Sequence, residues 1–168
     1  MKILLMGNPN VGKSTIFNRL TGADVMISNF PGTTVEFSHG SIKIGDEYFE
    51  IIDVPGTYSL SPTCKAEEIA VRILESEPDS VIVNVVSSTK LERSLYLTLQ
   101  LTERKHSLVI ALNMWDEASR EGIDIHLEKL ETIIGCPCVP VCAISGEGIK
   151  HLVEKLDKAQ IPKLHTNP

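Results

Sequence analysis

The sequence predicts an α/β fold, in which a six-stranded, mostly parallel sheet has one antiparallel edge strand and helices on both faces. Two observations predict it. Short apolar runs typical of buried strands alternate with stretches of helical periodicity along the chain. A glycine-containing octet, Gly7 to Ser14, joins the first apolar run to the first helical stretch. Because crossovers between parallel strands are right-handed, helices cover both faces and the loops after the strands meet at one edge.

The same patterns place each element in order. We expect strands at Lys2–Met6, Ser41–Ile44, Tyr48–Ile52, Val81–Val86, Leu108–Leu112 and Cys138–Val141. We expect helices at Lys13–Leu20, Ala66–Ser76, Leu91–Glu103, His126–Ile134 and Ile149–Lys158. Gly45 and Asp46 are turn residues, so they predict the hairpin that gives the sheet its antiparallel strand. A chain of 168 residues with 42% hydrophobic content can bury one substantial core, which indicates one domain.

A phosphate-binding loop is predicted by the octet Gly7-Asn8-Pro9-Asn10-Val11-Gly12-Lys13-Ser14, which Thr15 follows. Its glycines allow a tight turn in which backbone N–H groups face phosphate oxygens, and the next helix adds partial positive charge at its N-terminus. Lys13 would neutralise the β- and γ-phosphates, and Ser14 would offer its hydroxyl to Mg²⁺. The alternative is a turn before an ordinary helix. ATPases, kinases and GTPases share this loop, so it does not identify the base.

The base is indicated by a tetrad that follows an apolar strand, Asn113-Met114-Trp115-Asp116. The Asp116 carboxylate can accept hydrogen bonds from guanine N1–H and the exocyclic amine, whereas adenine presents an acceptor at N1 and no amine there. Asn113 would tie this loop to the phosphate loop and to the purine. A last loop with the same placement is Cys142-Ala143-Ile144, where the Ala143 N–H would reach guanine O6. Asn and Asp are ordinary turn residues, so the order of the loops is what gives these motifs weight.

A third motif loop lies between the first two, where an apolar strand ends at Asp53-Val54-Pro55-Gly56. Asp53 can hold Mg²⁺ through a water molecule. The Gly56 N–H can approach the γ-phosphate closely because this residue has no side chain. A structural turn explains Pro-Gly equally well. Its position between the other two loops favours the role in ligand binding.

These loops in this order resemble those of the Ras-like, translation-factor-related GTPases, a superfamily of P-loop NTPases, over nearly the whole chain. Five longer strings are similar to the N-terminal G domain of the ferrous-iron transport protein B (FeoB) family: Gly7–Ser14, Asn29–Glu36, Asp53–Pro62, Leu91–Leu101 and Asn113–Ala118. Generic small GTPases do not share the second, the extended third or the fourth string. The resemblance therefore points to one family within the superfamily.

The resemblance implies that Thr34, which follows Thr33, is the switch I threonine. Its hydroxyl would bind Mg²⁺ and its backbone would contact the γ-phosphate. The segment from Gly22 to Val35 contains small polar residues with little to pack, so we expect a loosely held loop when GTP is absent. An ordinary surface loop is the alternative.

Many GTPases orient the attacking water with a glutamine just after the glycine that corresponds to Gly56, but here Thr57 follows. The resemblance implies that a K⁺ ion, held by Asn10 and backbone carbonyls around Ser28 to Phe30, would stabilise the charge that develops between the phosphates. The alternative is that Asn10 satisfies the backbone of its own loop. We favour the K⁺ role, and the implied catalytic residues are then Asn10, Lys13, Thr34 and Gly56.

The implied activity is slow, Mg²⁺-dependent and K⁺-stimulated hydrolysis of GTP to GDP and phosphate. Residues 1–160 would form the G domain, on the cytoplasmic side of the cell membrane, and would regulate or drive ferrous-iron uptake through the membrane transport domain of the same full-length chain. Residues 161–168 would be a linker or tail, because the helical and membrane domains of the family are absent from this sequence. Alternatives are a ribosome or assembly GTPase and a binding switch with negligible turnover. A homo-oligomer is left open.

Composition argues against other classes of function. A net charge of −6 and the lack of a basic run argue against a nucleic-acid partner. The sequence has no apolar stretch of about 18 residues and no signal peptide, so we expect this fragment alone to be soluble. Cys136, Cys138 and Cys142 lie in an apolar segment, which favours small buried side chains over a metal site or a disulfide. The histidines show no ligand spacing, so the sequence does not support iron binding by this chain.

The sequence departs from the family pattern in two places, at Cys142 and at the pair Ser87-Ser88. Cys142 stands where the family usually has serine, and the loss of the hydroxyl would weaken hydrogen bonds that support the last loop. We therefore expect faster nucleotide exchange. Ser87 and Ser88 stand where the family often has Asp-Ala, a change to which we assign no consequence.

Overall fold

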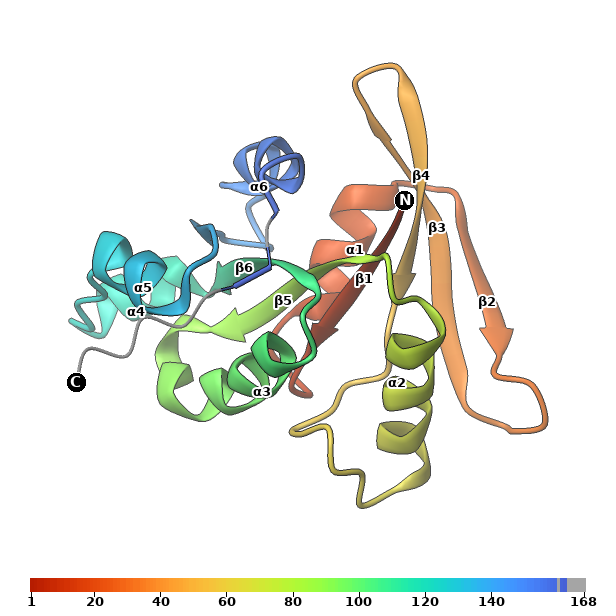
Figure 1. Ribbon diagram of the computed structural model, residues 1–168. Helices are drawn as coiled ribbons and strands as arrows, with labels where there is room; N and C mark the ends of the chain where they lie inside the picture. The colour runs from red at the N-terminus through yellow and green to blue at the C-terminus, as the bar shows by residue number, and fades with distance from the viewer. Residues whose placement is uncertain (160, 163–168) are drawn as a thin grey trace.

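The structure is a computed structural model that describes residues 1–159, 161 and 162. The predicted tail at 161–168 therefore lies mostly outside the described residues. Strands are β1 (Lys2–Gly7), β2 (Val25–Asn29), β3 (Glu36–Ile44), β4 (Glu47–Asp53), β5 (Val81–Ser87), β6 (Ser107–Asn113) and β7 (Cys138–Pro140). Helices are α1 (Lys13–Thr21), α2 (Lys65–Ser76), the 3-10 helix η1 (Ser88–Lys90), α3 (Leu91–Glu103), α4 (Trp115–Arg120), α5 (Leu127–Ile134) and α6 (Ile149–Leu156). They flank a seven-stranded sheet in the order β2-β3-β4-β1-β5-β6-β7 (Figure 1).

The central part of the sheet is parallel, as the sequence predicts. β1 pairs with β4 on one side and β5 on the other, and β6 and β7 continue in the same direction. The register places Ile3 opposite Ile51 on β4 and opposite Val81 on β5. The β3–β4 hairpin turns at Gly45 and Asp46, as predicted. Because β1, β4, β6 and β7 run the same way, the motif loops that follow them leave from one edge of the sheet.

The sheet has one strand more than the sequence predicts. Residues Val25–Asn29, which we expected in a loop, form the edge strand β2 and pair antiparallel with β3. β3 itself begins at Glu36 instead of Ser41. No alternating pattern reveals β2, because the consecutive residues Met26 and Ile27 are both exposed, at 61% and 68%. Backbone pairing with β3, and not the burial of one face, holds this strand, which lies at the margin of the sheet in Figure 1.

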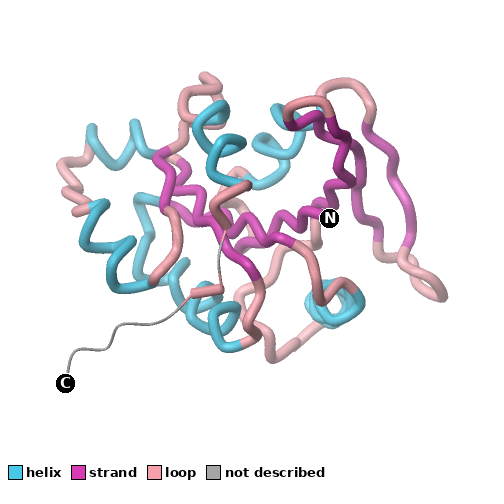
Figure 2. The backbone as a smooth tube through the Cα atoms, turned by 45° about the horizontal axis from the view of Figure 1, so that its top comes forward, coloured by secondary structure: helices cyan, strands magenta, loops and turns pink. Residues whose placement is uncertain are grey.

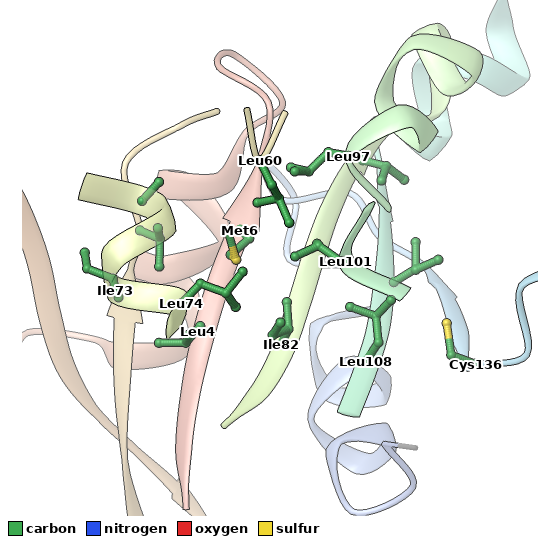
Figure 3. Packing of buried hydrophobic residues seen from close by; sticks show 14 of the residues in the cluster. Leu4, Met6, Leu60, Ile73, Leu74, Ile82, Leu97, Leu101, Leu108 and Cys136 are labelled. Carbon is green, nitrogen blue, oxygen red and sulfur yellow. The ribbon is translucent and has the colours of Figure 1, made fainter. Parts of the chain in front are cut away.

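Apolar side chains pack on both faces of the sheet because successive strand residues point to opposite sides. On β1, Leu4 and Met6 belong to a cluster that contains side chains of α2 and α3 (Figure 3). Ile3 and Leu5 belong to the cluster on the other face, with side chains of α1 and α6. All four are fully buried. Figure 2 shows the helices on the two sides of the sheet, so the fold has three layers with β1 at their centre.

The predicted helices are confirmed to within two residues at each end, and α3 spans the predicted Leu91–Glu103. Its buried residues Leu97 and Leu101 agree with a role in core packing. Two short helices, α4 and η1, were not predicted, and they have six and three residues. Elements this short do not repeat the helical period, so no amphipathic pattern identifies them.

The cysteines include three buried side chains, Cys136, Cys138 and Cys142, and one exposed one, Cys64; all four are free thiols. A hydrogen bond with Cys136, together with burial, raises the pKa of the Cys138 thiol. Across the described residues, no group of three or more His, Cys, Asp or Glu side chains is arranged to hold a metal ion. Nor does any helix among them have the length and apolar character needed to cross a bilayer.

Candidate functional site

The phosphate loop connects β1 to α1 at the carboxyl edge of the sheet. Gly12, the residue before α1, has φ 83°, in the left-handed region that glycine adopts at little cost. A side chain on Gly12 would collide with the amide nitrogen of Asn113. Because Gly12 has no side chain, Asn113 can reach the loop, and its Nδ2 donates to the Val11 carbonyl at 2.8 Å. A residue of the predicted base-binding tetrad thus supports the phosphate loop.

Three of the predicted phosphate and metal residues meet beside this loop. Lys13 Nζ forms an ion pair with Asp53 Oδ1, and Ser14 Oγ donates to Asp53 Oδ2 at 3.1 Å. β4 carries Asp53 to this place because it lies parallel to β1, with Leu5 opposite Asp53. The Lys13 and Asp53 side chains are 10% and 11% exposed, so water screens their attraction little. The oxygens of Ser14 and Asp53 are the kind of ligand that Mg²⁺ prefers, so these residues fit the predicted metal.

A cavity of about 360 Å³ lies against the phosphate loop and is lined by Asn8, Pro9, Asn10, Gly12, Lys13, Ser14, Thr15 and Gly56. Gly56 packs closely on the loop, since a side chain there would lie 3.2 Å from atoms of Pro9. The next residue, Thr57, donates its backbone N–H to the Gly7 carbonyl at 3.0 Å. The loops after β1 and β4 therefore adjoin, and they bring the predicted phosphate contacts together.

A second cavity, of about 310 Å³, lies between the tetrad and the last motif loop, and its lining includes Asn113, Met114, Asp116, Cys142, Ala143 and Ile144. A hydrogen bond with the Cys142 side chain is the main cause that lowers the pKa of Asp116. Asp116 is therefore a carboxylate at neutral pH, and it pairs with Arg120 one helical turn away at 3.0 Å. Asp116 thus places a charged acceptor in the lining of this cavity.

The Asn113 side chain connects this base cavity to the phosphate loop. It is 3% exposed, and its Oδ1 accepts the N–H of Ala143 at 3.0 Å. The sequence assigns that N–H to guanine O6, so the structure differs from the prediction. A buried amide oxygen needs a donor, and the Ala143 N–H supplies it. The next N–H in the loop, that of Ile144, has no acceptor within the part of the chain that the structure describes.

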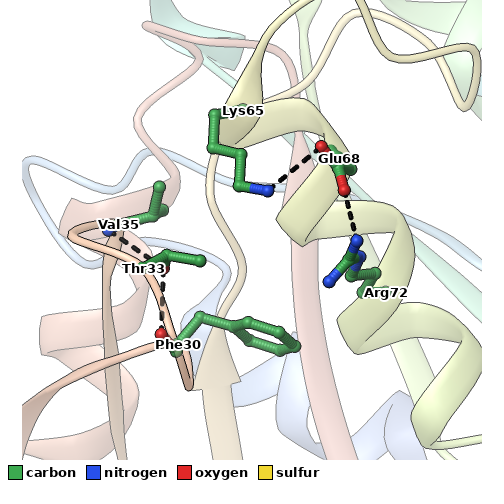
Figure 4. Close-up of polar contacts among 6 residues, drawn as sticks. All are labelled: Phe30, Thr33, Val35, Lys65, Glu68 and Arg72. Carbon is green, nitrogen blue, oxygen red and sulfur yellow. Dashed lines mark hydrogen bonds and ion pairs between the residues drawn. The ribbon is translucent and has the colours of Figure 1, made fainter.

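Thr34 does not line the phosphate cavity. The tip of the β2–β3 connection closes on itself: the Phe30 N–H donates to the Val35 carbonyl at 2.9 Å. Thr33 Oγ1 donates to the Phe30 carbonyl at 2.9 Å and accepts the Val35 N–H at 3.2 Å (Figure 4). Phe30 and Val35 also pack against the cluster on the α2 face, while Thr34 is exposed. The tip therefore has more to pack than the sequence indicates, because two partly buried side chains contact the core beside its own hydrogen bonds.

Asn10 lies where the two cavities meet, and it lines both. Its φ is 65°, a left-handed conformation that asparagine adopts more readily than most residues. Its side chain is exposed and has no hydrogen-bond partner among the described residues. The backbone therefore gives one reason for an asparagine here. The amide group, however, does not satisfy the backbone of the loop and is available to a ligand.

The segment between β4 and α2 is held by two residues that the sequence analysis missed. Glu67, in the first turn of α2, accepts the N–H of Tyr58 at 3.3 Å and the N–H and hydroxyl of Thr63, each at 2.8 Å. These hydrogen bonds, chiefly those from Thr63, lower the pKa of Glu67. Gln100 on α3 accepts the Leu60 N–H at 2.7 Å. An acidic residue in the first turn of a helix was a usable signal for Glu67, whereas nothing in the sequence marks Gln100.

Thr57, which stands in the place of the usual glutamine, is fully buried. Its hydroxyl donates to the Ser59 carbonyl at 2.6 Å. The neighbouring Tyr58 ring lies under the guanidinium of Arg93, 4.7 Å from Cζ to the ring centroid. Neither residue is among those that line the phosphate cavity, whereas Tyr58 lines a neighbouring cavity together with Asn8 and Asn10.

Comparison with known proteins identifies the family. Residues 1–156 match the family described as ferrous iron transport protein B. The chain belongs to the FeoB family. The resemblance seen in the sequence is therefore confirmed over nearly the whole chain.

Curated FeoB relatives are much longer proteins. The chain is 45% identical over 159 residues to the Fe(2+) transport protein A/Fe(2+) transporter FeoB fusion protein of Porphyromonas gingivalis, with 93% of the chain and 19% of that protein covered. It is 42% identical over 162 residues to the Fe(2+) transporter FeoB of Salmonella typhimurium, with 94% and 21% covered. The chain thus spans about a fifth of the length of these relatives.

Solved FeoB structures share the fold. The cytosolic domain of L. pneumophila FeoB matches with a TM-score of 0.94 at 41% identity, over 100% of this chain and 67% of that one. The FeoB G-domain from Methanococcus jannaschii gives 0.81 at 42% identity, over 94% and 97%. A GDP-bound mutant of S. thermophilus NFeoB gives 0.89 at 40% identity, over 96% and 63%. The predicted G-domain fold is confirmed.

Proposed function

We propose that this FeoB G domain binds GTP and GDP and hydrolyses GTP to GDP and phosphate. The observation that carries the proposal is that one buried side chain, Asn113, joins the phosphate loop to the base cavity through hydrogen bonds of 2.8 and 3.0 Å. A single ligand with phosphates at one end and a base at the other fits this arrangement. The Asp116 carboxylate favours guanine over adenine, because adenine would face it with an acceptor. The GDP-bound state of the S. thermophilus relative supports the same conclusion.

The residues at the phosphate end have distinct roles in this proposal. Lys13 would exchange Asp53 for the β- and γ-phosphates, and Ser14 and Asp53 would then hold Mg²⁺. Bound Mg²⁺ supplies positive charge to the phosphate oxygens. The Gly56 N–H can approach the γ-phosphate because the residue places no side chain against Pro9. Thr34 would have to leave the exposed tip of its loop to join this group.

We propose that turnover is slow and stimulated by K⁺. The Thr57 hydroxyl is bonded to Ser59, so this position offers no side chain that orients water. The Asn10 amide borders both cavities and makes no hydrogen bond among the described residues, which supports its role as a ligand of a monovalent cation. The Thr57 contact also favours a second candidate, a nucleotide-dependent binding switch whose turnover is negligible until a partner supplies the missing charge.

For the full-length protein we propose a role in ferrous-iron uptake. The domain would lie on the cytoplasmic side of the cell membrane and would regulate or drive a membrane transport domain of the same chain. The support is that the relatives are Fe(2+) transporters of which this chain spans about a fifth. Family membership also favours the transporter over a ribosome or assembly GTPase. Nucleotide hydrolysis by this domain is the part of the proposal that can be tested directly.

The test is single-turnover GTP hydrolysis with Mg²⁺, in KCl and in NaCl at equal ionic strength, for the wild type and Asn10→Ala. We expect K⁺ to accelerate the wild type and to lose that effect in the variant. Arg104→Ala is the control. Arg104 directly follows α3, and its guanidinium pairs with Glu75 on α2, away from the site. Tight GDP binding without hydrolysis in either salt would favour the binding switch, and failure to bind GDP would refute the whole proposal.

A further inference from the structure

We propose that Arg19 is a positioning residue for the base-binding loop and that it slows the dissociation of guanine nucleotides. Arg19 lies on α1, the helix that begins at the phosphate loop, and contacts the loop from Cys142 to Glu147. It belongs to none of the motif loops and does not line the base cavity, so it acts through the loop and not on the base. The inference rests on the guanine-nucleotide binding proposed above.

The Arg19 guanidinium holds two successive carbonyls of this loop. Nε donates to the Ala143 carbonyl at 3.0 Å, and Nη2 donates to the Ile144 carbonyl. A guanidinium presents its N–H groups in a fixed planar fork, so it can fix two neighbouring acceptors at once. Within the described residues Arg19 has no carboxylate partner, and these carbonyls are the acceptors of its charge-assisted hydrogen bonds.

The loop also packs over the guanidinium. Gly146 has φ 87°, and a side chain on it would lie 3.2 Å from Arg19 Nη1 and 3.4 Å from Cζ. The loop is closed by hydrogen bonds of its own, from the Cys142 N–H to the Glu147 carbonyl and from the Gly146 N–H to the Cys142 carbonyl, each at 2.9 Å. Because the loop is a closed unit, anchoring one part of it restrains the whole.

Ala143 is restrained from two directions. Its N–H donates to Asn113 at the end of β6, and its carbonyl accepts from Arg19 on α1, each at 3.0 Å. The base loop is therefore tied both to the sheet and to the helix that carries Lys13 and Ser14. Without Arg19, the loop would keep its link to the sheet through the Ala143 N–H but would lose its link to α1. A loop already held in its binding shape loses less conformational entropy when a base binds, so the bound nucleotide leaves more slowly.

The test measures GDP dissociation from the 168-residue chain during a chase with excess GTP. We expect Arg19→Ala to release GDP about 10-fold faster, because the variant loses both charge-assisted hydrogen bonds that hold the loop. Arg19→Lys should fall between the variant and the wild type, since an ammonium cannot hold both carbonyls in one plane. Arg104→Ala removes a different exposed arginine and should match the wild type. A release rate for Arg19→Ala within about twofold of wild type would overturn the proposal.

A second measurement separates positioning from a general loss of stability. For each protein, affinity for GDP is compared with affinity for 2-aminopurine riboside 5′-diphosphate, which keeps the exocyclic amine but lacks both the O6 that the loop is expected to contact and the N1–H that faces Asp116. The analogue binds the wild type more weakly for the second reason, so the effect of Arg19→Ala is taken for each ligand relative to wild type with the same ligand. If Arg19 orients the loop, Arg19→Ala weakens GDP binding and leaves the analogue nearly unchanged. Equal losses for both ligands would contradict a positioning role, and Arg19→Lys carries the same test if the alanine variant does not fold. A wild type that binds neither diphosphate would refute the nucleotide function on which the inference rests.

Discussion

Asn113 Oδ1 accepts the N–H of Ala143 at 3.0 Å and so ties the last motif loop to the end of β6. The same side chain donates to the Val11 carbonyl of the phosphate loop, 102 residues earlier in the chain. One buried amide therefore sets the distance between the place for a base and the place for phosphates. In the proposed function, recognition of the two ends of a nucleotide is coupled through this single residue.

Replacing Asn113 with alanine is expected to weaken GDP binding about 100-fold. The change leaves the Val11 carbonyl and the Ala143 N–H without their partner, and each lost link is worth about 1.4 kcal/mol, or a factor of about ten. Isothermal titration calorimetry measures the affinity directly. Asn18→Ala, at an exposed position on α1, is the control and should bind like the wild type. An affinity for Asn113→Ala within about threefold of wild type would show that the amide does not couple the two loops.

Asp116→Asn is expected to change the base preference from guanine to xanthine. The asparagine amide can donate to the O2 carbonyl of xanthine, whereas it no longer offers guanine N1–H and amine a carboxylate. We expect GDP affinity to fall by a factor on the order of 100 and XDP affinity to rise. Competition between the two diphosphates measures the exchange. Arg120→Ala removes the ion-pair partner of Asp116 but keeps the carboxylate, so it should retain the guanine preference.

Cys142→Ser is expected to slow GDP release about threefold, because a hydroxyl is a stronger hydrogen-bond donor than a thiol. Cys142 already interacts with Asp116, since it is the main cause of the lowered pKa of that carboxyl group. A serine would strengthen this contact and stabilise the loop. Stopped-flow dissociation of a fluorescent GDP analogue measures the rate, with the exposed Cys64→Ser as control. Identical rates for Cys142→Ser and wild type would refute the expectation of faster exchange in the natural chain.

His106 is expected to make the fold sensitive to mild acid. Burial lowers the pKa of His106 from its ordinary 6.5, and a hydrogen bond with the Ser80 backbone opposes this only in part. The unfolded chain then takes up a proton at a higher pH than the folded chain. Above about pH 6.5, His106 is neutral in both states and does not reduce the free energy of unfolding. As the pH drops below that value, protonation of the unfolded chain lowers the free energy of unfolding.

Urea unfolding at about pH 7.5 and about pH 5.5 tests this sign. The wild type should lose stability between the two conditions, and His106→Asn should lose less. His151→Gln is the control, because that ring is 55% exposed whereas His106 is buried. An equal loss in His106→Asn and wild type would show that another group carries the pH dependence.

The parallel sheet and most of the site could be predicted because their requirements are local. A buried parallel strand such as Val81–Ser87 reads as a mainly apolar run, interrupted only by Asn84 before it ends at Ser87. A phosphate loop needs certain residue types at fixed spacing, so Lys13 and Ser14 were recognisable without the structure. Asp53 followed from its place at the end of a strand. These residues do meet in the fold as expected.

The rest depends on contacts that no local pattern records. Strand β2 is held by its backbone partners, so Met26 and Ile27 gave no signal of alternation. Arg19 binds a backbone carbonyl 124 residues further along the chain, and a carbonyl is the same whichever residue carries it. The contact of the Ala143 N–H with Asn113 was not foreseen for a related reason, because the sequence cannot rank two acceptors for one donor.

The packing of the tip around Thr34 is expected to make the position of this loop depend on temperature. Phe30 and Val35 flank this threonine and pack against the core, so recruiting Thr34 to Ser14 and Asp53 would withdraw apolar surface from the interior. The stabilisation that comes from burying apolar surface weakens on cooling. Low temperature therefore favours the released tip, and higher temperature favours the tip packed against the core. A ligand that recruits Thr34 would therefore bind with a less negative heat-capacity change than one that leaves it in place. The calorimetric difference between GTP and GDP would then register the position of this loop.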